Sequence, residues 1–265
     1  MKEHLLPGFF ARQFRLEGKV ALIMGGRGAL AEAIAACLAD LGCAVALASR
    51  HEQDCIALAT TIGERFQVKS TGLRCDISKE EEVEATIKAT VDQLGSLDIL
   101  INNAGASWWG LPEDIPLSGW RKVVDVNLTG TFLACRHAAR HMIAHGGGSM
   151  INIASSGAFI SYKPEDGQVV PYTTTKAAMV HLTRDLAAQW AHHGIRVNAV
   201  APGSIETGMT ETLEQGIQQK LLDSILLRRF AQPVEMVGAV ALLASSAGSF
   251  ITGQTYIVDG GQTIA

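Results

Sequence analysis

The chain lacks both long apolar runs and clusters of basic residues. A helix that crosses a bilayer needs about 20 consecutive apolar residues, and no stretch of this sequence reaches that length. The formal net charge is −4, and no segment has the basic run that marks proteins of nucleic acids or anionic membrane surfaces. We therefore expect a protein with no membrane segment and no nucleic-acid partner.

Cysteine is scarce and is not arranged for bridging or for metal binding. The five cysteines are odd in number and show no CxxC spacing, a pattern typical of reduced, buried thiols rather than a disulfide framework. The first 19 residues contain no long apolar stretch, which disfavours secretion and leaves a cryptic targeting peptide as the alternative. The sequence therefore predicts a cytoplasmic location. The cysteines are Cys37, Cys43, Cys55, Cys75 and Cys135.

What the chain does have is an apolar content of 48% over 265 residues, enough for one large, well-buried domain. Short β-type runs alternate with long helical patterns, an order that predicts βαβ units. The expected fold class is α/β, a single Rossmann-like doubly wound parallel sheet with helices on both faces. We expect residues 18–265 to form a single dinucleotide-binding and catalytic domain after an N-terminal extension at residues 1–17. The expected strands cover residues 19–24, 43–49, 71–76, 97–104, 149–154, 195–202 and 255–260, and the expected helices 31–42, 79–95, 119–147, 173–194 and 234–246.

A glycine-rich turn follows the first expected strand. Gly25, Gly26 and Gly28 give the turn its flexibility, and such a turn lets backbone N–H groups and the helix dipole face a pyrophosphate. The same residues also suit a plain strand-to-helix turn, so the motif alone does not identify a nucleotide site. Two positions where such loops usually carry glycine hold Ala29 and Ala31.

The end of the second expected strand bears on the choice of dinucleotide. An acidic residue there would accept hydrogen bonds from the ribose 2′-OH and repel a 2′-phosphate, but this strand ends in Ser49 and Arg50. A guanidinium suits phosphate oxygens, and Arg27 in the glycine-rich turn could add a second cation. The sequence favours NADP(H), with NAD(H) as the alternative. The competing interpretation is that Arg50 is a solvated surface charge.

Tyr172 and Lys176 are four residues apart in a helical segment, so their side chains share one face. Tyrosine has a pKa of about 10, too high for ready proton exchange at neutral pH. A nearby ammonium and an oxidised, positively charged nicotinamide would both lower the pKa of the phenol. Tyr172 would then give a proton to a carbonyl oxygen or remove one from an alcohol.

From about Lys19 to Gly261 the sequence resembles the classical short-chain dehydrogenase/reductase family. The turn after Met24 is similar to the family's TGxxxGxG loop, Asn102–Gly105 matches its NNAG turn, and Tyr172 with Lys176 matches its YxxxK pair. The resemblance implies that Ser155 contacts the substrate oxygen, with Ser156 as the fallback, and that Asn127 holds a proton-relay water. The catalytic set it implies is Asn127, Ser155, Tyr172 and Lys176.

The same resemblance places a larger group of residues around the cofactor. A methyl group at Ala29 is expected to displace the loop or the cofactor slightly, unless Gly28 takes over the role. Asp76 and Ile77 correspond to the adenine-contacting pair, and the PGxIxT-like segment from Pro202 to Thr207 to the contacts with the nicotinamide carboxamide. The full set is Gly25, Gly26, Arg27, Gly28, Leu30, Ser49, Arg50, Asp76, Ile77, Asn103, Ala104, Gly105, Tyr172, Lys176, Pro202, Gly203, Ile205 and Thr207.

Two irregular segments, 160–171 and 203–224, follow strands and should lie where doubly wound sheets bind ligands. Sixteen residues separate Ser155 from Tyr172, more than in the shortest family members. The added polar side chains suit a polyhydroxylated or acidic substrate, or they belong to an exposed loop without that role. They are Lys163, Glu165, Asp166 and Gln168.

Two other pairs have competing interpretations. Trp108 and Trp109 form a wall of the substrate pocket or pack against a neighbouring loop. His137 and His141 have the i, i+4 spacing of zinc ligands, but no third ligand is evident, so a helix surface or subunit contact is favoured and no metal site is predicted.

The sequence thus predicts an NADP(H)-dependent oxidoreductase that interconverts a carbonyl and a secondary alcohol. Around the site the chain looks most similar to gluconate 5-dehydrogenase-like members of the family, which implies a sugar acid or a polyol as the small-molecule substrate. The alternatives are a 3-oxoacyl-(acyl-carrier-protein) reductase and, from another class, a non-catalytic nucleotide-sensing regulatory protein. By resemblance, the helices around 121–145 and 172–193 would form a homotetramer or homodimer.

Overall fold

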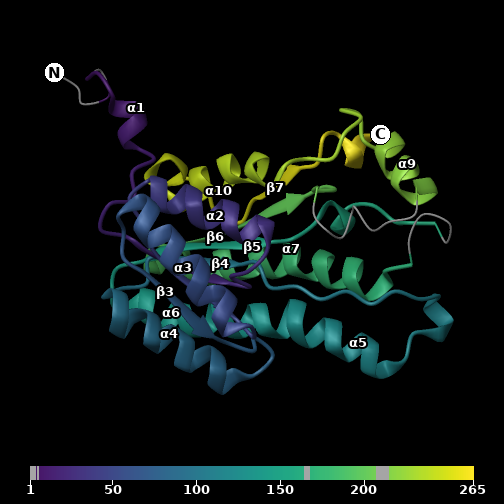
Figure 1. Ribbon diagram of the computed structural model, residues 1–265, viewed down its shortest axis with the longest axis horizontal. Coiled ribbons are helices and arrows are strands. Elements are labelled where there is room, and N and C mark those ends of the chain that lie inside the picture. Colours follow the sequence, from purple (N-terminus) through teal and green to yellow (C-terminus); the bar gives the residue numbers. More distant parts are fainter. Residues whose placement is uncertain (1–3, 5, 164–167, 207–214) are drawn as a thin grey trace.

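The computed structural model describes residues 4, 6–163, 168–206 and 215–265 (Figure 1). Within these residues a seven-stranded sheet has the strand order β3-β2-β1-β4-β5-β6-β7, and every neighbouring pair is parallel. The order reverses between β1 and β4, which makes the carboxyl ends of these two strands a topological switch point. The expected Rossmann-like doubly wound sheet is confirmed. The strands are β1 (Val20–Met24), β2 (Ala44–Ser49), β3 (Ser70–Arg74), β4 (Ile99–Asn102), β5 (Gly148–Ile153), β6 (Ile195–Pro202) and β7 (Thr255–Val258).

Helices cover both faces of this sheet. Figure 1 shows α2 and α10 on one side and α4 and α6 on the other. A π-helical turn at Asp125–Thr129 joins α5 to α6. The helices are α1 (Phe9–Arg12), α2 (Ala29–Asp40), α3 (Glu52–Phe66), α4 (Glu80–Leu94), α5 (Leu117–Val124), α6 (Gly130–Ala144), α7 (Val170–Trp190), α9 (Gln215–Ser224) and α10 (Val237–Ala244).

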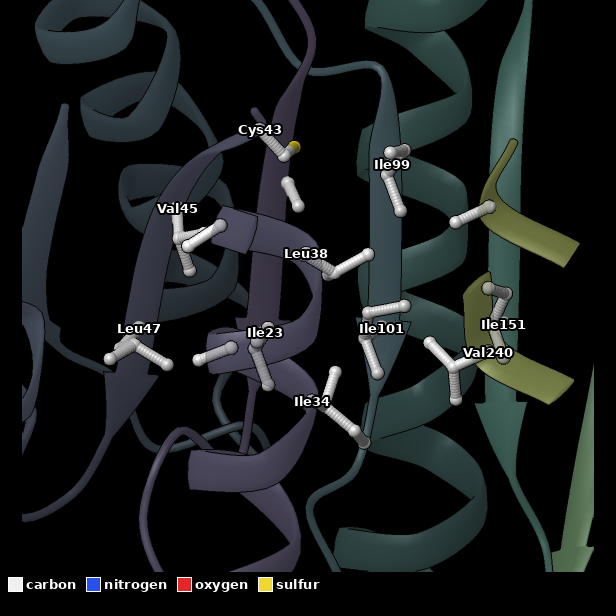
Figure 2. Close-up of a cluster of buried hydrophobic side chains, with 14 of the residues drawn as sticks. Ile23, Ile34, Leu38, Cys43, Val45, Leu47, Ile99, Ile101, Ile151 and Val240 are labelled. Carbon is white, nitrogen blue, oxygen red and sulfur yellow. The ribbon is translucent and has the colours of Figure 1, made fainter. Parts of the chain in front are cut away.

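The apolar strands are buried on both sides because their side chains alternate between two cores. In β1, Ile23 points toward Ile34 and Leu38 of α2 in one core (Figure 2), while Leu22 lies in the opposite core with residues of α4, α6 and α7. Both strand residues are fully shielded from solvent. The continuous apolar runs of the sequence therefore reflect a sheet sandwiched between two helical layers.

Four elements differ from the sequence expectations, and the first is the helix expected over 119–147, which a π-helical turn divides into α5 and α6. The helix α3 was not expected, since its buried residues are only Cys55, Ala59 and Ile62, a narrow stripe in an otherwise polar segment. The segment 203–224 was expected to be irregular, but α9 occupies its last part. The helix expected over 173–194 already begins at Val170, because Pro171 suits the first turn.

Among the helices of the described residues, none is both long enough and apolar enough to cross a membrane.

Candidate active site

The glycine-rich turn holds β1 against its neighbours before it opens toward a ligand. Gly25 has φ +83°, and a Cβ atom there would lie 2.4 Å from the backbone nitrogen of Ala104. The N–H groups of Gly25 and Gly26 both donate to the carbonyl oxygen of Ala48, at 2.8 and 2.9 Å. Because these two N–H groups already have hydrogen-bond partners within the fold, the N–H groups that can face a phosphate are those at the start of α2.

Gly28 marks that beginning. It is the N-cap residue of α2, has φ +88°, and a Cβ atom there would meet nothing within 4 Å. The first turn of a helix carries N–H groups without helical partners, and the macrodipole adds positive potential. Open space beside such a helix start is what a pyrophosphate requires.

The two alanines in the motif have different environments. Ala29 is the first residue of α2 and is exposed, whereas Ala31 is fully buried. The methyl group of Ala31 is therefore packed inside the protein, and the chain keeps the turn without the family's second and third glycines.

A cleft of about 470 Å³ lies at the carboxyl ends of β1, β2, β3 and β4. It brings together most of the residues expected around the adenosine half of a dinucleotide: Gly25, Arg27, Ser49, Arg50, Asp76, Ile77, Asn103, Ala104 and Gly105. The lining also includes Lys122, Asp125 and Val126, which the sequence reasoning missed because they come from α5 and the π-helical turn. The expected residues Gly26, Gly28 and Leu30 are not part of this lining; they support the turn or begin α2.

Charge around the cleft is mixed. Arg27 Nη1 lies 3.3 Å from Asp54 Oδ2, and both side chains are about half exposed, at 49% and 55%. Burial raises the pKa of Asp76, but hydrogen bonds from Ser78 and the charges of Arg50 and Lys79 outweigh it, so the pKa is lowered. Asp76 is therefore an anion that faces cations of the cleft.

Ser49 is placed at the cleft with its hydroxyl already engaged. The Oγ atom accepts hydrogen bonds from the His51 N–H at 3.1 Å and from the Cys55 thiol at 3.1 Å. The Cys55 thiol also approaches the carbonyl oxygen of Gly26 at 3.5 Å. Cys55 thus ties the turn after β2 to the glycine-rich turn.

The tyrosine–lysine pair lies on α7 as expected. Lys176 is 3% exposed, its ammonium donates to the carbonyl oxygen of Ile153 at 2.6 Å, and its Nζ lies 5.6 Å from the centre of the Tyr172 ring. Burial lowers the pKa of Lys176 to about 8. The two side chains share one helix face, as the i, i+4 spacing requires.

The lowering of the Tyr172 pKa was expected from the ammonium together with a bound, oxidised nicotinamide, and in the chain by itself the pKa is raised. Burial raises the pKa of Tyr172, and a hydrogen bond with Ser155 offsets only part of that effect. The ammonium of Lys176 is itself buried and disfavoured, so it does not overcome the desolvation of the phenol. Any lowering must therefore come from a further positive charge at the site.

The geometry favours Ser155 over Ser156 as the substrate contact. Ser155 interacts with Tyr172, and its Oγ accepts a hydrogen bond from the N–H of Gly157 at 3.1 Å. Ser156 is 2% exposed and its hydroxyl donates to Gln262 Oε1 at 3.2 Å. The fallback residue is therefore turned into the protein interior.

Asn127 sits in the π-helical turn and is fully buried. Its Oδ1 accepts from the N–H of Ala106 at 2.7 Å, and its Nδ2 donates to the Ala106 carbonyl and to Thr175 Oγ1, both at 3.0 Å. A Cβ atom at Gly105 would lie 3.8 Å from Asn127 Oδ1 and 3.9 Å from Lys176 Nζ. The side-chain amide thus holds the segment between the dinucleotide cleft and Lys176 in place, while its water-holding role stays a prediction.

A buried polar chain lies beneath these groups. Asn102 Nδ2 donates to Asn152 Oδ1 at 2.8 Å, and Asn152 Nδ2 donates to Thr183 Oγ1 at 2.9 Å. The three residues belong to β4, β5 and α7, and all are 1% exposed or less. The chain connects the strands that carry the cleft to α7, which carries Tyr172 and Lys176.

The segment after β6 is held beside β7. The N–H of Gly203 donates to the Val258 carbonyl at 2.9 Å, and a Cβ atom at Gly203 would lie 2.7 Å from Asp259 Cα. Ile205 forms a parallel bridge with Ala231. Pro202, Gly203 and Ile205 therefore stand at the end of β6, while Thr207 lies outside the described residues.

Near the substrate side, Trp108 packs on α5: a Cβ atom at Gly119 would lie 2.5 Å from its ring, and Lys122 Nζ is 5.9 Å from the ring centre. Trp109 is 54% exposed. For Trp108 the structure thus favours packing over the role of an open pocket wall. Lys163 is exposed, and Glu165 and Asp166 lie outside the described residues, whereas the Gln168 carbonyl accepts a hydrogen bond from the Gly110 N–H at 3.0 Å.

Tyr162 is a residue of this side that the sequence reasoning missed. A Cβ atom at Gly157 would lie 3.4 Å from Ser155 Oγ and 3.7 Å from Tyr162 Cε2, so Gly157 separates the two side chains. Burial raises the pKa of Tyr162, and the charge of Tyr172 raises it further. No spacing rule pointed to this residue, because its position depends on how the chain folds back after Ser155.

The histidine pair has no metal-like surroundings in the described part of the chain. His137 is 5% exposed and its Nε2 lies 3.2 Å from a Glu80 carboxylate oxygen. Among the described residues, no group of three or more candidate side chains could hold a metal ion.

The residues present fit a dinucleotide cofactor: a helix start with open space, a cleft at the switch point, two arginines in its lining, and Lys176 next to Gly105 of that lining, with Tyr172 one helical turn away. Together, fold and site define a nicotinamide-dependent oxidoreductase.

Comparison with known proteins agrees. A family model described as enoyl-(acyl carrier protein) reductase matches residues 26–263. The chain is 36% identical over 249 residues to the 3-oxoacyl-(acyl-carrier-protein) reductase FabG of Aquifex aeolicus, covering 94% of this chain and 99% of that protein. It is 36% identical over 253 residues to the 2-dehydro-3-deoxy-D-gluconate 5-dehydrogenase of Escherichia coli, covering 94% and 96%.

A solved structure of a gluconate 5-dehydrogenase from Burkholderia cenocepacia, in complex with NADP and tartrate, matches with a TM-score of 0.90 at 34% identity, covering 96% of this chain and 98% of that one. These matches show that the chain belongs to the short-chain dehydrogenase/reductase family. It is an NAD(P)-dependent enzyme that acts on alcohol and carbonyl groups, and the resemblance seen in the sequence is confirmed.

Proposed function

We propose that the protein interconverts the carbonyl and secondary-alcohol forms of a sugar acid or polyol with NADP(H), and that Tyr172 carries the proton. The observation that supports this proposal best is that Tyr172 lies beside both Ser155 and Lys176, with Lys176 Nζ 3.9 Å from a Cβ atom placed at Gly105 of the cleft lining. The bound nicotinamide would accept or donate the hydride. Asn103, Ala104 and Gly105 would line its path, and Pro202, Gly203 and Ile205 would contact its carboxamide.

The chain's own residues handle the proton and the orientation of the substrate. The Ser155 hydroxyl donates a hydrogen bond to the substrate oxygen, and the Tyr172 hydroxyl gives that oxygen a proton or takes one from it. At neutral pH Lys176, with a pKa of about 8, is mostly charged, and its charge together with that of an oxidised nicotinamide would stabilise the phenolate. Its bond to Ile153 fixes the ammonium in place while this happens.

The NADP(H) preference is supported by Arg50 and Arg27, which line the cleft beside the end of β2. A free ribose hydroxyl would call for a carboxylate at that strand end, which Ser49 and Arg50 do not supply. The Burkholderia gluconate 5-dehydrogenase is in complex with NADP, which is consistent with this choice.

The sugar-acid substrate is supported by the polar segment that follows Ser155, with Tyr162 beside the catalytic serine and Lys163 exposed next to it. The same neighbour is in complex with tartrate, a small hydroxy acid. The second candidate, a 3-oxoacyl-(acyl-carrier-protein) reductase, is supported by the 36% identity with the Aquifex enzyme.

One assay separates these candidates. Purified protein is mixed with NADPH and a panel of keto-sugar acids, keto-polyols and 3-oxoacyl thioesters, and the loss of reduced-nicotinamide absorbance is followed. Turnover of keto-sugar acids that is sensitive to Lys163→Ala supports the first candidate. Turnover of thioesters that depends on acyl chain length supports the second. Binding of NADPH without turnover of any of these would support a nucleotide-sensing protein.

Assembly and location extend the same proposal. We infer a homotetramer or homodimer built on α6 and α7, since Phe132 and Ile143 on α6 are 38% and 40% exposed. A monomer in sedimentation equilibrium would refute it. A cytoplasmic location is supported by five cysteines that are all free and mostly buried.

A further inference from the structure

Asp54, in the first turn of α3, is the acidic partner of a cleft residue. Its Oδ2 lies 3.3 Å from Nη1 of Arg27, and Arg27 lines the dinucleotide cleft. The guanidinium therefore pairs with this carboxylate and also lines the cleft expected to hold the adenosine half of a dinucleotide. In this arrangement Arg27 is not free to give its full charge to a ligand.

From this geometry we propose that Asp54 is a specificity-determining residue that weakens binding of the 2′-phosphorylated cofactor relative to the unphosphorylated one. The inference rests on the proposed use of Arg27 and Arg50 as 2′-phosphate contacts. Asp54 acts in two ways: it occupies Arg27, and it adds a negative charge near the phosphate. NAD(H) has no 2′-phosphate and should respond less to both effects.

The pair is poorly suited to a purely structural role. Both side chains are about half exposed, and exposed ion pairs contribute little to folding. A phosphate monoester at that place carries close to two negative charges, so the carboxylate has a larger effect on the ligand than on the fold. Removing the charge of Asp54 should therefore change cofactor selectivity more than stability.

Cys55 connects the start of α3 to both turns of the cleft, so a substitution in the first turn of α3 can affect the glycine-rich turn and the turn after β2. Its thiol bonds to Ser49 Oγ at 3.1 Å and approaches the Gly26 carbonyl at 3.5 Å. The start of α3 thus contacts the turn that carries Arg50 and the turn that carries Arg27. Asp54 adds the charged contact to this connection.

The test is a titration of purified protein with NADPH and with NADH, followed by nicotinamide fluorescence. Asp54→Asn keeps the shape and removes the charge. We expect it to tighten NADPH about three- to tenfold, a size typical of one nearby charge in water, and to change NADH less than about twofold. The gain should shrink as salt is raised, since exposed charges are screened.

Glu52→Gln is the matched control. Glu52 is an exposed acid in the same first turn of α3, and residues two apart project to nearly opposite sides of a helix. The control removes the same net charge and should leave both affinities unchanged. In an Arg27→Gln background, Asp54→Asn should give a smaller gain, because the guanidinium it releases is absent.

Equal changes in Asp54→Asn and Glu52→Gln would overturn the proposal, as would equal changes for NADPH and NADH. If Asp54→Asn fails to fold, Asp54→Ser gives the same readout, since it also replaces the carboxylate with a neutral side chain. A wild-type protein that prefers NADH would refute the proposed NADP(H) preference, yet the ratio of the two affinities in the variant would still decide the role of Asp54.

Discussion

Lys176 reaches from α7 to the end of β5, where its ammonium donates to the carbonyl oxygen of Ile153 at 2.6 Å. The hydrogen bond fixes Nζ one helical turn from Tyr172 in a position that is 3% exposed. Burying a charged ammonium lowers the free energy of unfolding, and this effect can be measured.

Lys176→Met should increase stability at neutral pH. The pKa of Lys176 is about 8 in the folded state, below its value in the unfolded chain, so the folded protein binds fewer protons between these two values. Stability should therefore rise with pH from about 8 to about 10, and the burial penalty below pH 8 is about 3 kcal/mol. Urea unfolding at several pH values would show the rise in the wild type and a flat profile in the variant. The same slope in both proteins would contradict the assignment.

Tyr172→Phe should lower kcat by about 10²- to 10⁴-fold, the usual contribution of a positioned proton donor. The NADPH dissociation constant should change little, because the ring remains in place. Tyr256→Phe, a phenol on β7, is the matched control and should keep full activity. A Tyr172→Phe enzyme that retains more than a few per cent of wild-type turnover would end the proton-transfer assignment.

Arg50→Ala should weaken NADPH more than NADH, because only the first carries a 2′-phosphate for the guanidinium to bind. We expect at least about a tenfold loss for NADPH, the size of a charge-assisted contact. Arg65→Ala, in the last turn of α3, removes the same charge far from the helix start and should change neither affinity. Equal losses for both cofactors would dismiss the contact.

Adding a methyl group at Gly25 and removing one at Ala31 should both lower the stability of the fold. Gly25→Ala forces a side chain into φ +83° and against Ala104, which should destabilise the fold by about 1–3 kcal/mol or more. Ala31→Gly loses a fully buried methyl inside α2 and should cost about 1 kcal/mol. Thermal and urea unfolding would measure both. A Gly25→Ala protein as stable as wild type would contradict the close approach.

Ala29→Gly tests whether the altered motif matters to the cofactor. Ala29 is exposed at the start of α2, and Gly28 already supplies the open space. We expect NADPH affinity to change by less than about threefold, since a helix-end alanine-to-glycine change involves only a fraction of a kcal/mol. A gain of tenfold or more would show that the methyl group crowds the ligand.

The sequence predicts elements that have a repeating apolar pattern, and it misses residues whose positions depend on tertiary contacts. The strand around Leu22 and Ile23 was predicted because both faces of a parallel sheet are apolar. Helix α3 was missed because only three of its residues are buried. Tyr162 and Lys122 were missed because their places depend on how distant segments meet in space. Ser49 lines the cleft as expected, but no sequence pattern showed that its hydroxyl accepts hydrogen bonds within the turn after β2.

The polar chain through Asn102, Asn152 and Thr183 has a practical consequence for protein engineering. Replacing any one of these residues leaves a buried polar group of its neighbour without its hydrogen bond. The chain therefore tolerates substitution only when several of its positions change together. The stretches that begin at Trp108 and at Gly157 are joined by a backbone hydrogen bond from the Gly110 N–H to the Gln168 carbonyl, which does not depend on which side chains stand there. To change the substrate of this enzyme, the loop residues after Trp108 and Gly157 should therefore be replaced while the buried polar chain is kept.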